Sequence, residues 1–153
     1  MDAKNIYALF ATDAKKEQTG RWCGIGNSEF LLARAGGSNT KFTSAYAAAM
    51  RPFQRQQAIG AFTEEQAREV LVGPFVKHVL LGWRTRLFDE NGKFTGKYDE
   101  GILLGKDNEK ITYTAEAAKA LMLDIPDLLM TLVETSNSFV NYTPEDAEEA
   151  AKN

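Results

Sequence analysis

Two side chains in this sequence are of the types needed for nucleophilic or acid–base chemistry. Cys23 lies in the segment Trp-Cys-Gly-Ile-Gly, and His78 is the single histidine of the chain. A nucleophilic thiol needs a neighbouring base that raises its thiolate fraction, and His78 could supply it only if the fold brings the two together. Cys23 otherwise fits a small strand residue, and His78 a partly buried residue at the edge of a helix. We therefore expect no enzymatic activity and no catalytic residues.

The sequence also indicates no metal or cofactor site. A lone histidine without a second histidine or a cysteine cluster makes a poor zinc site. The acidic residues between positions 89 and 109 do not follow the spacing of a calcium loop, and lysines are interleaved with them. The glycine-containing segments 24–28 and 36–39 match neither phosphate-binding fingerprint, and turn glycines explain both. We predict a solvated loop in the acidic region.

The composition indicates a soluble protein and gives no support for nucleic acid or membrane as a partner. The 153 residues are 44% hydrophobic and 25% charged, as in an ordinary soluble domain with its own core. A net charge of −3 gives no support for nucleic-acid binding. One cysteine excludes an intramolecular disulfide and suits a reducing cytosol. We see no signal peptide and no apolar run long enough to cross a membrane, so we expect a cytoplasmic protein.

The excess of acid lies at the C-terminus. The segment after Tyr142 contains four acidic residues and a single basic residue, Lys152. We predict that residues 1–142 form a single α+β domain and that residues 143–153 form an acidic tail. Thr143 could cap a short final helix in this tail, or the tail could fray into a flexible segment.

The first quarter of the chain favours β-structure. An apolar run at 6–11 is rich in strand formers, and a polar loop is expected at 12–20. Segments 21–25 and 29–34 are typical strands joined by the turn Gly26-Asn27-Ser28. We predict a small antiparallel sheet within a β-rich region, residues 1–37.

From Thr40 onward the apolar residues recur at helical spacing, until Pro52 interrupts the pattern. Thr63 and Gln66 form a capping box for a second helix, whose apolar positions continue to Trp83. Gly73-Pro74 predicts a kink in it or a division into two parts, and the run 75–83, apolar almost all round, predicts burial.

The remaining segments contain one strong turn and two further helices. Asp89-Glu-Asn-Gly is the clearest turn signal of the chain, and 94–105 is expected to be irregular or a hairpin. Helices are expected at 115–122 and, with Pro126 in its first turn, at 125–139. The predicted fold class is α+β, with a small N-terminal antiparallel β region and a mainly α-helical part at 40–142.

An aromatic series made of Trp83, Phe88, Phe94 and Tyr98 surrounds the 89–92 turn. Trp83 could belong to the core with the other three around it. The series could also be a platform for a protein partner, because aromatic residues are enriched among interface anchors. The sequence leaves both interpretations open.

The order of short motifs along the chain resembles the tail assembly chaperones of long-tailed, siphovirus-like bacteriophages. The segments that carry the resemblance are Gly20-Arg-Trp-Cys-Gly-Ile-Gly, Phe30 to Asn39, Met50-Arg-Pro, Leu81-Gly-Trp-Arg, Asp89-Glu-Asn-Gly-Lys, Tyr113 to Leu121, Ile125-Pro-Asp-Leu and Phe139. They extend over nearly the whole chain. The excursion 94–110 is longer than the link expected between Gly92 and Tyr113.

The resemblance implies a non-enzymatic protein that binds and solubilises the tape measure protein and helps to recruit the tail tube protein. It implies a role in the host cytoplasm and absence from the mature virion. Many such proteins also have a longer, frameshifted form, and the end of the chain, Ala151-Lys-Asn, is compatible with a slippery codon run.

A helical client needs an apolar groove, and we expect the 70–83 helix and the 121–133 region to form its walls. The predicted partner-binding residues are Phe75, Val79, Trp83, Phe88, Leu121, Leu128, Leu129 and Leu132.

Two other functions stay open. The chain could be a structural virion protein, such as a tail completion or head–tail joining component, or a regulator that binds a host protein. Self-association is also open, because the oligomeric state cannot be read from the sequence.

Overall fold

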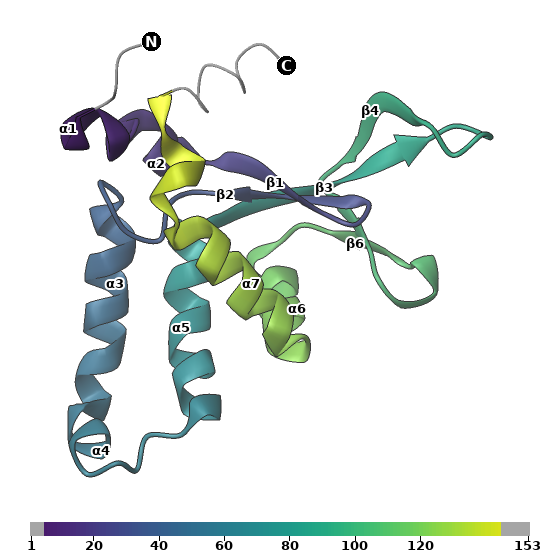
Figure 1. Ribbon diagram of the computed structural model, residues 1–153. Helices are drawn as coiled ribbons and strands as arrows, with labels where there is room; N and C mark the ends of the chain where they lie inside the picture. The colour runs from purple at the N-terminus through teal and green to yellow at the C-terminus, as the bar shows by residue number, and fades with distance from the viewer. Residues whose placement is uncertain (1–4, 145–153) are drawn as a thin grey trace.

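The structure is a computed structural model that describes residues 5–144 (Figure 1). A four-stranded antiparallel sheet with the order β1-β2-β3-β4 lies at its centre, and β5 and β6 form a separate two-stranded sheet. In chain order the elements are α1 (Ile6–Leu9), α2 (Ala14–Thr19), β1 (Arg21–Ile25), β2 (Ser28–Leu32), α3 (Thr40–Met50), η1 (Arg51–Phe53), α4 (Gln54–Ala58), α5 (Glu64–His78), β3 (Leu80–Phe88), β4 (Phe94–Glu100), β5 (Ile102–Leu104), η2 (Lys106–Asn108), β6 (Lys110–Thr112), α6 (Ala115–Asp124), α7 (Pro126–Asn137) and η3 (Phe139–Tyr142).

The N-terminal segment differs from its prediction. The expected strand at 6–11 is the short helix α1, whose Asn5 side chain accepts a hydrogen bond from the Ala8 amide at 3.0 Å. The expected loop at 12–20 contains the helix α2, which Asp13 caps by accepting from the amides of Lys15 and Lys16. Both predictions were wrong for the same reason. A side-chain cap directs the next turn of the chain into helix, and this effect outweighs the strand propensity of 6–11 and the polarity of 12–20.

The first hairpin of the sheet agrees with the sequence. Strands β1 and β2 pair antiparallel through a turn at Gly26, whose φ of 61° suits glycine. Strand β2 then pairs with β3, which places Phe30 opposite Trp83 and Leu32 opposite Leu80 on the face toward the core. The other face of β2 carries Glu29.

The helices α3 and α5 stand side by side and connect through η1 and α4 (Figure 1). The capping box of α5 is present: the Thr63 hydroxyl accepts from the Gln66 amide at 3.1 Å, and the Gln66 side chain accepts from the Thr63 amide at 3.0 Å. Helix α5 runs through Gly73 and Pro74 as one element, so the expected division into two parts is absent.

The predicted helix to Trp83 is wrong in its second half. Helix α5 ends at His78, Val79 leaves helical geometry at φ −122° and ψ −56°, and strand β3 begins at Leu80. From Leu80 the strand pairs with β2, and from Arg84 it pairs with β4 as well, which an isolated turn of helix could not match. The predicted burial of the 75–83 run is nevertheless confirmed, because Phe75, Val79 and Trp83 are all buried.

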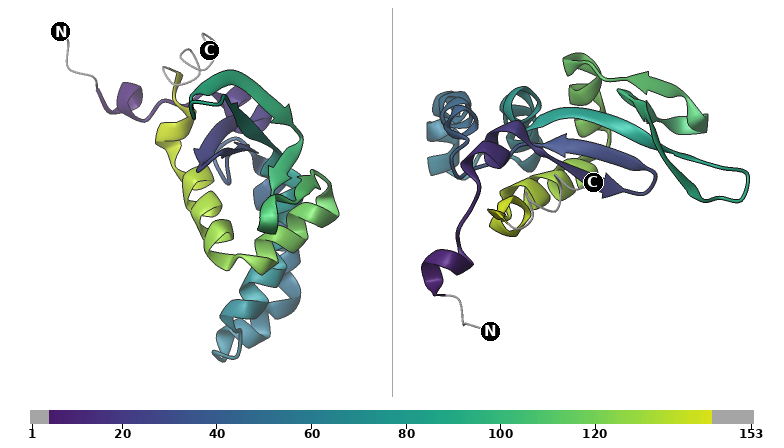
Figure 2. Two further views of the ribbon diagram at one scale, coloured as in Figure 1. Left: turned by 90° about the vertical axis from the view of Figure 1, so that its right-hand side faces the viewer. Right: turned by 90° about the horizontal axis from the view of Figure 1, so that it is seen from above.

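The segment 94–110 consists mainly of β-structure. The turn Asp89–Gly92 joins β3 to β4, and the Asp89 carboxylate accepts from the amides of Asn91 and Lys93, both at 2.9 Å. The β3–β4 hairpin projects from the body of the molecule (Figure 2). The chain then turns at Gly101, and β5 pairs with β6. Of the two predicted alternatives for this segment, the hairpin is confirmed.

Helices α6 and α7 meet at a sharp corner. Ile125 separates them with an extended backbone at φ −124° and ψ 80°, because a residue that precedes proline is excluded from helical geometry. Pro126 begins α7 in agreement with the sequence, and the helix ends at Asn137 rather than near Phe139. The one-turn helix η3 follows and buries Tyr142, whose hydroxyl donates to the Leu32 carbonyl oxygen at 3.0 Å.

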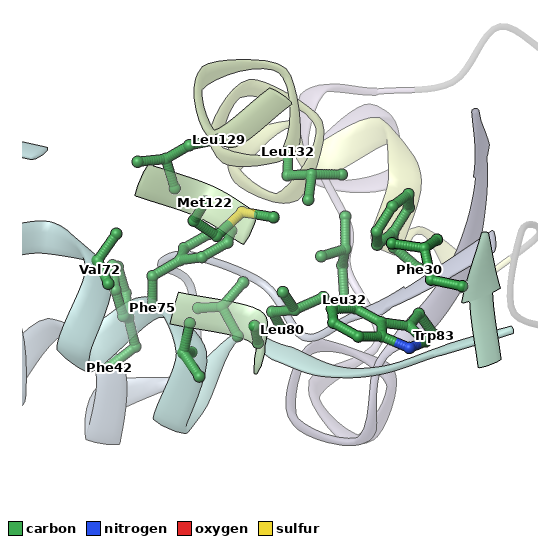
Figure 3. Close-up of a cluster of buried hydrophobic side chains, with 14 residues drawn as sticks. Phe30, Leu32, Phe42, Val72, Phe75, Leu80, Trp83, Met122, Leu129 and Leu132 are labelled. Atoms are coloured by element: carbon green, nitrogen blue, oxygen red, sulfur yellow. The ribbon is translucent and has the colours of Figure 1, made fainter. Parts of the chain in front are cut away.

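The core lies where one face of the sheet meets α5, α6 and α7 (Figure 3). Phe30 and Trp83 contribute large rings from the sheet, and Met122, Leu129 and Leu132 pack from the two last helices. The fold is α+β as predicted. The division into a β-rich 1–37 and a helical 40–142 is wrong, because β3 to β6 lie between residues 80 and 112. The acidic tail lies outside the described residues from position 145 onward.

A candidate partner-binding groove

Among the described residues, an apolar groove with a volume of about 620 Å³ opens on the surface. It lies between the β5–β6 hairpin, the β1–β2 turn and the α6–α7 corner. Its apolar lining consists of Ile25, Phe30, Leu103, Leu104, Ile111, Leu121, Ile125 and Leu128, and its polar lining of Ser28, Gly105, Lys106, Glu109 and Asp124. An apolar floor with a few charged residues is the usual chemistry of a binding cleft.

The α6–α7 corner forms one wall of the groove. Because Ile125 is extended, α7 leaves at an angle to α6, and Leu121, Ile125 and Leu128 come together on the inner side of the corner. Leu121 and Leu128 are half-buried, whereas Ile125 is 44% exposed. The wall therefore presents branched apolar side chains to an incoming partner.

The β5–β6 hairpin forms the opposite wall, and side-chain hydrogen bonds fix the hairpin and the residue after it to β3. The Trp83 indole N–H donates to the Ile111 carbonyl oxygen at 3.1 Å. The Thr85 hydroxyl donates to the Ile102 carbonyl oxygen at 2.7 Å, and the Tyr113 hydroxyl to the Leu80 carbonyl oxygen at 2.7 Å. Burial raises the pKa of the Tyr113 hydroxyl, which therefore stays protonated and able to donate. This wall is held rigidly against the sheet.

A charged cluster stiffens the outer face of the sheet behind the groove. The Glu29 carboxylate accepts from the Arg84 Nε at 2.9 Å and from the Arg86 Nε at 2.8 Å. The Arg84 guanidinium lies 3.9 Å from the ring centre of Trp22 and 3.6 Å from that of Tyr98. Burial by itself would raise the pKa of Glu29, but the hydrogen bonds and positive charges of the two arginines outweigh it, so the pKa is lowered.

The aromatic series of the sequence divides between core and surface. Trp83 is 1% exposed, whereas Phe88 and Phe94 on the β3–β4 hairpin are 48% and 41% exposed. Their ring centres lie 6.0 Å apart, and Tyr98 lies 5.4 Å from Phe94. The core interpretation is confirmed for Trp83. For the exposed aromatic cluster of the hairpin, the role of a partner platform stays a prediction.

The eight predicted partner-binding residues fall into two groups. Leu121 and Leu128 line the groove, and Phe88 is exposed on the hairpin. The other five have essentially no accessible surface and pack in the core: Phe75, Val79, Trp83, Leu129 and Leu132. A side chain without accessible surface supports a partner-binding surface from behind but does not touch the partner.

Sequence reasoning missed most of the groove. Ile25, Leu104, Ile111 and Ile125 come from four separate elements or connections, and none belongs to a periodic apolar stripe. The one available signal was the isolated Ile102-Leu-Leu run inside a polar excursion, which is typical of a short strand with a buried face.

The two side chains with possible chemistry lie in different environments. Cys23 is on β1, packs against the core, and its thiol donates to the Arg21 carbonyl oxygen at 3.7 Å. His78 ends α5 and is half-buried, as the sequence predicted. Burial lowers the pKa of His78, and the charges of Lys77 and Lys41 lower it further. His78 lines a shallow polar depression with these two lysines, and Cys23 does not.

The described residues contain neither a cluster of metal-binding side chains nor a helix that could span a membrane. Between residues 5 and 144, no group of three or more His, Cys, Asp or Glu side chains is arranged to hold a metal ion. In the same range, none of the helices has the length and apolar character needed to cross a membrane.

Comparison with known proteins identifies a phage family. The family model of the YdaY prophage protein matches residues 37–153, which include every element from α3 to η3 and most of the groove. No curated protein and no solved structure matches the chain. Because the match extends over most of the sequence, the chain belongs to the YdaY prophage protein family.

Proposed function

We propose that this prophage protein is a tail assembly chaperone. In this role it binds and solubilises the tape measure protein in the host cytoplasm and helps to recruit the tail tube protein. The observation that carries the proposal is the apolar groove between β5–β6 and the α6–α7 corner. The phage origin of the family and the motif order of the sequence support the same role.

The groove has the apolar chemistry that a helical client requires, because an amphipathic helix binds by laying its apolar face into such a groove. An amphipathic helix that places its apolar side chains there would bury them against Leu121, Ile125 and Leu128. Lys106, Glu109 and Asp124 offer charges of both signs to the polar side of the client. Such binding needs no catalytic group, so we propose a non-enzymatic role.

A charged substitution at Ile125 tests the groove at a partly exposed position between two helices. Ile125 is the N-cap of α7 and makes no side-chain capping bond, whereas aspartate is a preferred N-cap residue. In Ile125→Asp a carboxylate would enter the apolar groove, and its burial under a client helix is strongly unfavourable. We expect the amount of tape measure protein that co-purifies after co-expression to fall at least about tenfold, equivalent to 1.4 kcal/mol or more.

Ile59→Asp is the matched control for this experiment. Ile59 is 71% exposed and follows α4, at the end of the α3–α5 pair away from the groove. Its substitution should leave co-purification unchanged. If both variants bind tape measure protein equally well, the groove is not its binding site. A wild-type protein that neither co-purifies with the tape measure protein nor keeps it soluble would overturn the proposed function itself.

The exposed aromatic cluster of the β3–β4 hairpin is our candidate for the contact with tail tube protein. Phe88 and Phe94 are about half-exposed on an element that projects from the body (Figures 1 and 2). We expect Phe88→Ser to reduce pull-down of tube protein several-fold while tape measure binding stays at the wild-type level, because the hairpin tip lies outside the groove lining. Loss of both interactions together would contradict two separate surfaces.

Presence in particles distinguishes the chaperone from the alternative role. A tail completion or head–tail joining component remains in the virion, whereas an assembly chaperone leaves before maturation. Mass spectrometry of purified particles, after induction of the prophage, should therefore detect tail tube protein and tape measure protein but not this chain. Its recovery at stoichiometric amounts would favour the structural role.

A further inference from the structure

We propose that the N-terminal helix α1 is a self-association element, through which two copies of this chain form a two-fold dimer. The patch involved, called here the α1 patch, consists of Ile6, Tyr7, Leu9, Phe10 and Val140. All five side chains are more than half exposed, with Tyr7 at 85% and Ile6 at 67%. The inference goes beyond the proposed function and does not depend on it.

The two segments that carry the α1 patch lie against each other. Phe10 directly follows α1, and its ring centre lies 4.9 Å from that of Phe139, the residue before Val140. A contact of the backbone holds the two segments together, because the Asp13 amide donates to the Tyr142 carbonyl oxygen at 2.7 Å. Singly exposed apolar residues are normal on a protein surface, but a contiguous patch of this kind usually marks an interaction site.

The shortness of α1 indicates that something packs against it. The helix has four residues and none of them is buried. An isolated helix of fewer than about 12 residues is only marginally stable in water, because its nucleation cost is spread over too few hydrogen bonds. The Asn5 cap lowers this cost but does not cover the apolar side chains. Apolar burial against a partner would provide the missing stabilisation.

Charge favours a second copy of the same chain as that partner. A two-fold contact places each patch against itself, so any net charge in the patch would repel its own copy. Residues 5–12 and 135–143, which provide the α1 patch, contain no Asp, Glu, Lys or Arg. A partner with a charged binding surface would find no complementary group there.

The available area is sufficient for a weak dimer. With about 200 Å² for a large apolar residue, the exposed fractions correspond to roughly 600 Å² per copy. Two copies would then bury at most about 1,200 Å², the lower end of the range for specific interfaces. We therefore expect a dissociation constant in the micromolar range. Figures 1 and 2 place α1 away from β5–β6 and α6, so the dimer would leave both grooves open.

Sedimentation equilibrium of the full chain between about 1 and 100 µM tests the dimer, a range chosen to bracket a micromolar dissociation constant. We expect the wild type to shift from monomer to dimer across this range. Tyr7→Asp and Leu9→Asp should each raise the dissociation constant at least tenfold, since each places a charge against its own copy. Both positions are more than half exposed, so their thermal midpoints should match the wild type.

Two control variants separate this proposal from its competitors. Ile59→Asp, another exposed isoleucine outside the α1 patch, should dimerise like the wild type. Ile125→Asp should also dimerise like the wild type; loss of dimer in this variant would mean that α1 of one copy enters the groove of the next, and would overturn the two-fold arrangement. A wild type that stays monomeric at 100 µM, or a dimer that both α1 variants retain, would overturn the proposal.

Discussion

Replacement of Trp83 by alanine is expected to lower the free energy of unfolding by about 3–5 kcal/mol, the usual cost of deleting a buried aromatic side chain. Trp83 is 1% exposed and lies between two aromatic rings, 6.5 Å from Phe30 and 5.0 Å from Tyr113 between ring centres. Its indole N–H also holds the Ile111 carbonyl oxygen. The substitution therefore leaves a cavity and an unpaired carbonyl group together.

Urea denaturation followed by circular dichroism measures this effect. Phe88→Ala is the matched control, because Phe88 lies on the same strand but is 48% exposed, and its loss should change stability by about 1 kcal/mol or less. Trp83→Phe should recover part of the stability by filling most of the cavity without restoring the hydrogen bond. A Trp83→Ala variant with wild-type stability would contradict the position of this side chain in the core.

The second large effect is expected at Glu29. In Glu29→Gln the side chain keeps its shape but loses the charge that pairs with Arg84 and Arg86, which lie at 2.7 and 2.8 Å. Glu29 is 6% exposed, so water replaces the lost interaction poorly. Hydrogen bonds to charged groups contribute about 1.5–3 kcal/mol each, and the partial exposure of both arginines reduces the loss, so we expect about 2–3 kcal/mol at pH 7.

The Glu29 carboxylate also makes the free energy of unfolding depend on pH, with stability lost as the pH falls. The pKa of Glu29 is lowered in the folded protein from an ordinary value of 4.5. Its stabilisation is therefore complete above pH 4.5 and is lost as the pH falls through the folded pKa. The stability difference between wild type and Glu29→Gln should shrink progressively below pH 4.5. Glu17 has a lowered pKa too, but it titrates in both proteins and cancels in the difference.

Glu100→Gln is the control for the charge effect. Glu100 also pairs with Arg84, at 3.7 Å, but its side chain is 66% exposed. Exposed ion pairs contribute little, so a change of about 0.5 kcal/mol or less is expected. Equal losses in both glutamate variants would mean that burial of Glu29 has no special effect on stability.

Several elements could be predicted because their signals are local. The turn at Gly26 and the turn at Asp89–Gly92 require residue types that only a few turn conformations accept. Thr63 and Gln66 satisfy each other's backbone groups within one turn of helix, so neither depends on the rest of the chain. Pro126 excludes helix before it and favours helix after it. Each of these signals acts over about four residues, and each was confirmed.

The errors occurred where long-range pairing decides the structure. The run from Phe75 to Trp83 is apolar almost all round, and such a run is compatible with both a buried helix and a buried strand. The change after Val79 follows from β2, which pairs with the first half of β3 from a distant part of the sequence. For the same reason Trp83 faces Phe30 across the sheet instead of continuing a helical stripe toward a partner.

The position and lining of the groove could be predicted even less from the sequence than the strand β3. Apolar periodicity, caps and turns by themselves determined that the chain is an α+β protein, because those properties are short patterns. They did not determine which apolar side chains stay accessible. Ile25, Ile111 and Ile125 are far apart in sequence and meet only after the sheet, the β5–β6 hairpin and the α6–α7 corner have assembled. Accessibility is a property of packed neighbours, so only the tertiary structure separates Leu128 at the groove from Leu129 in the core.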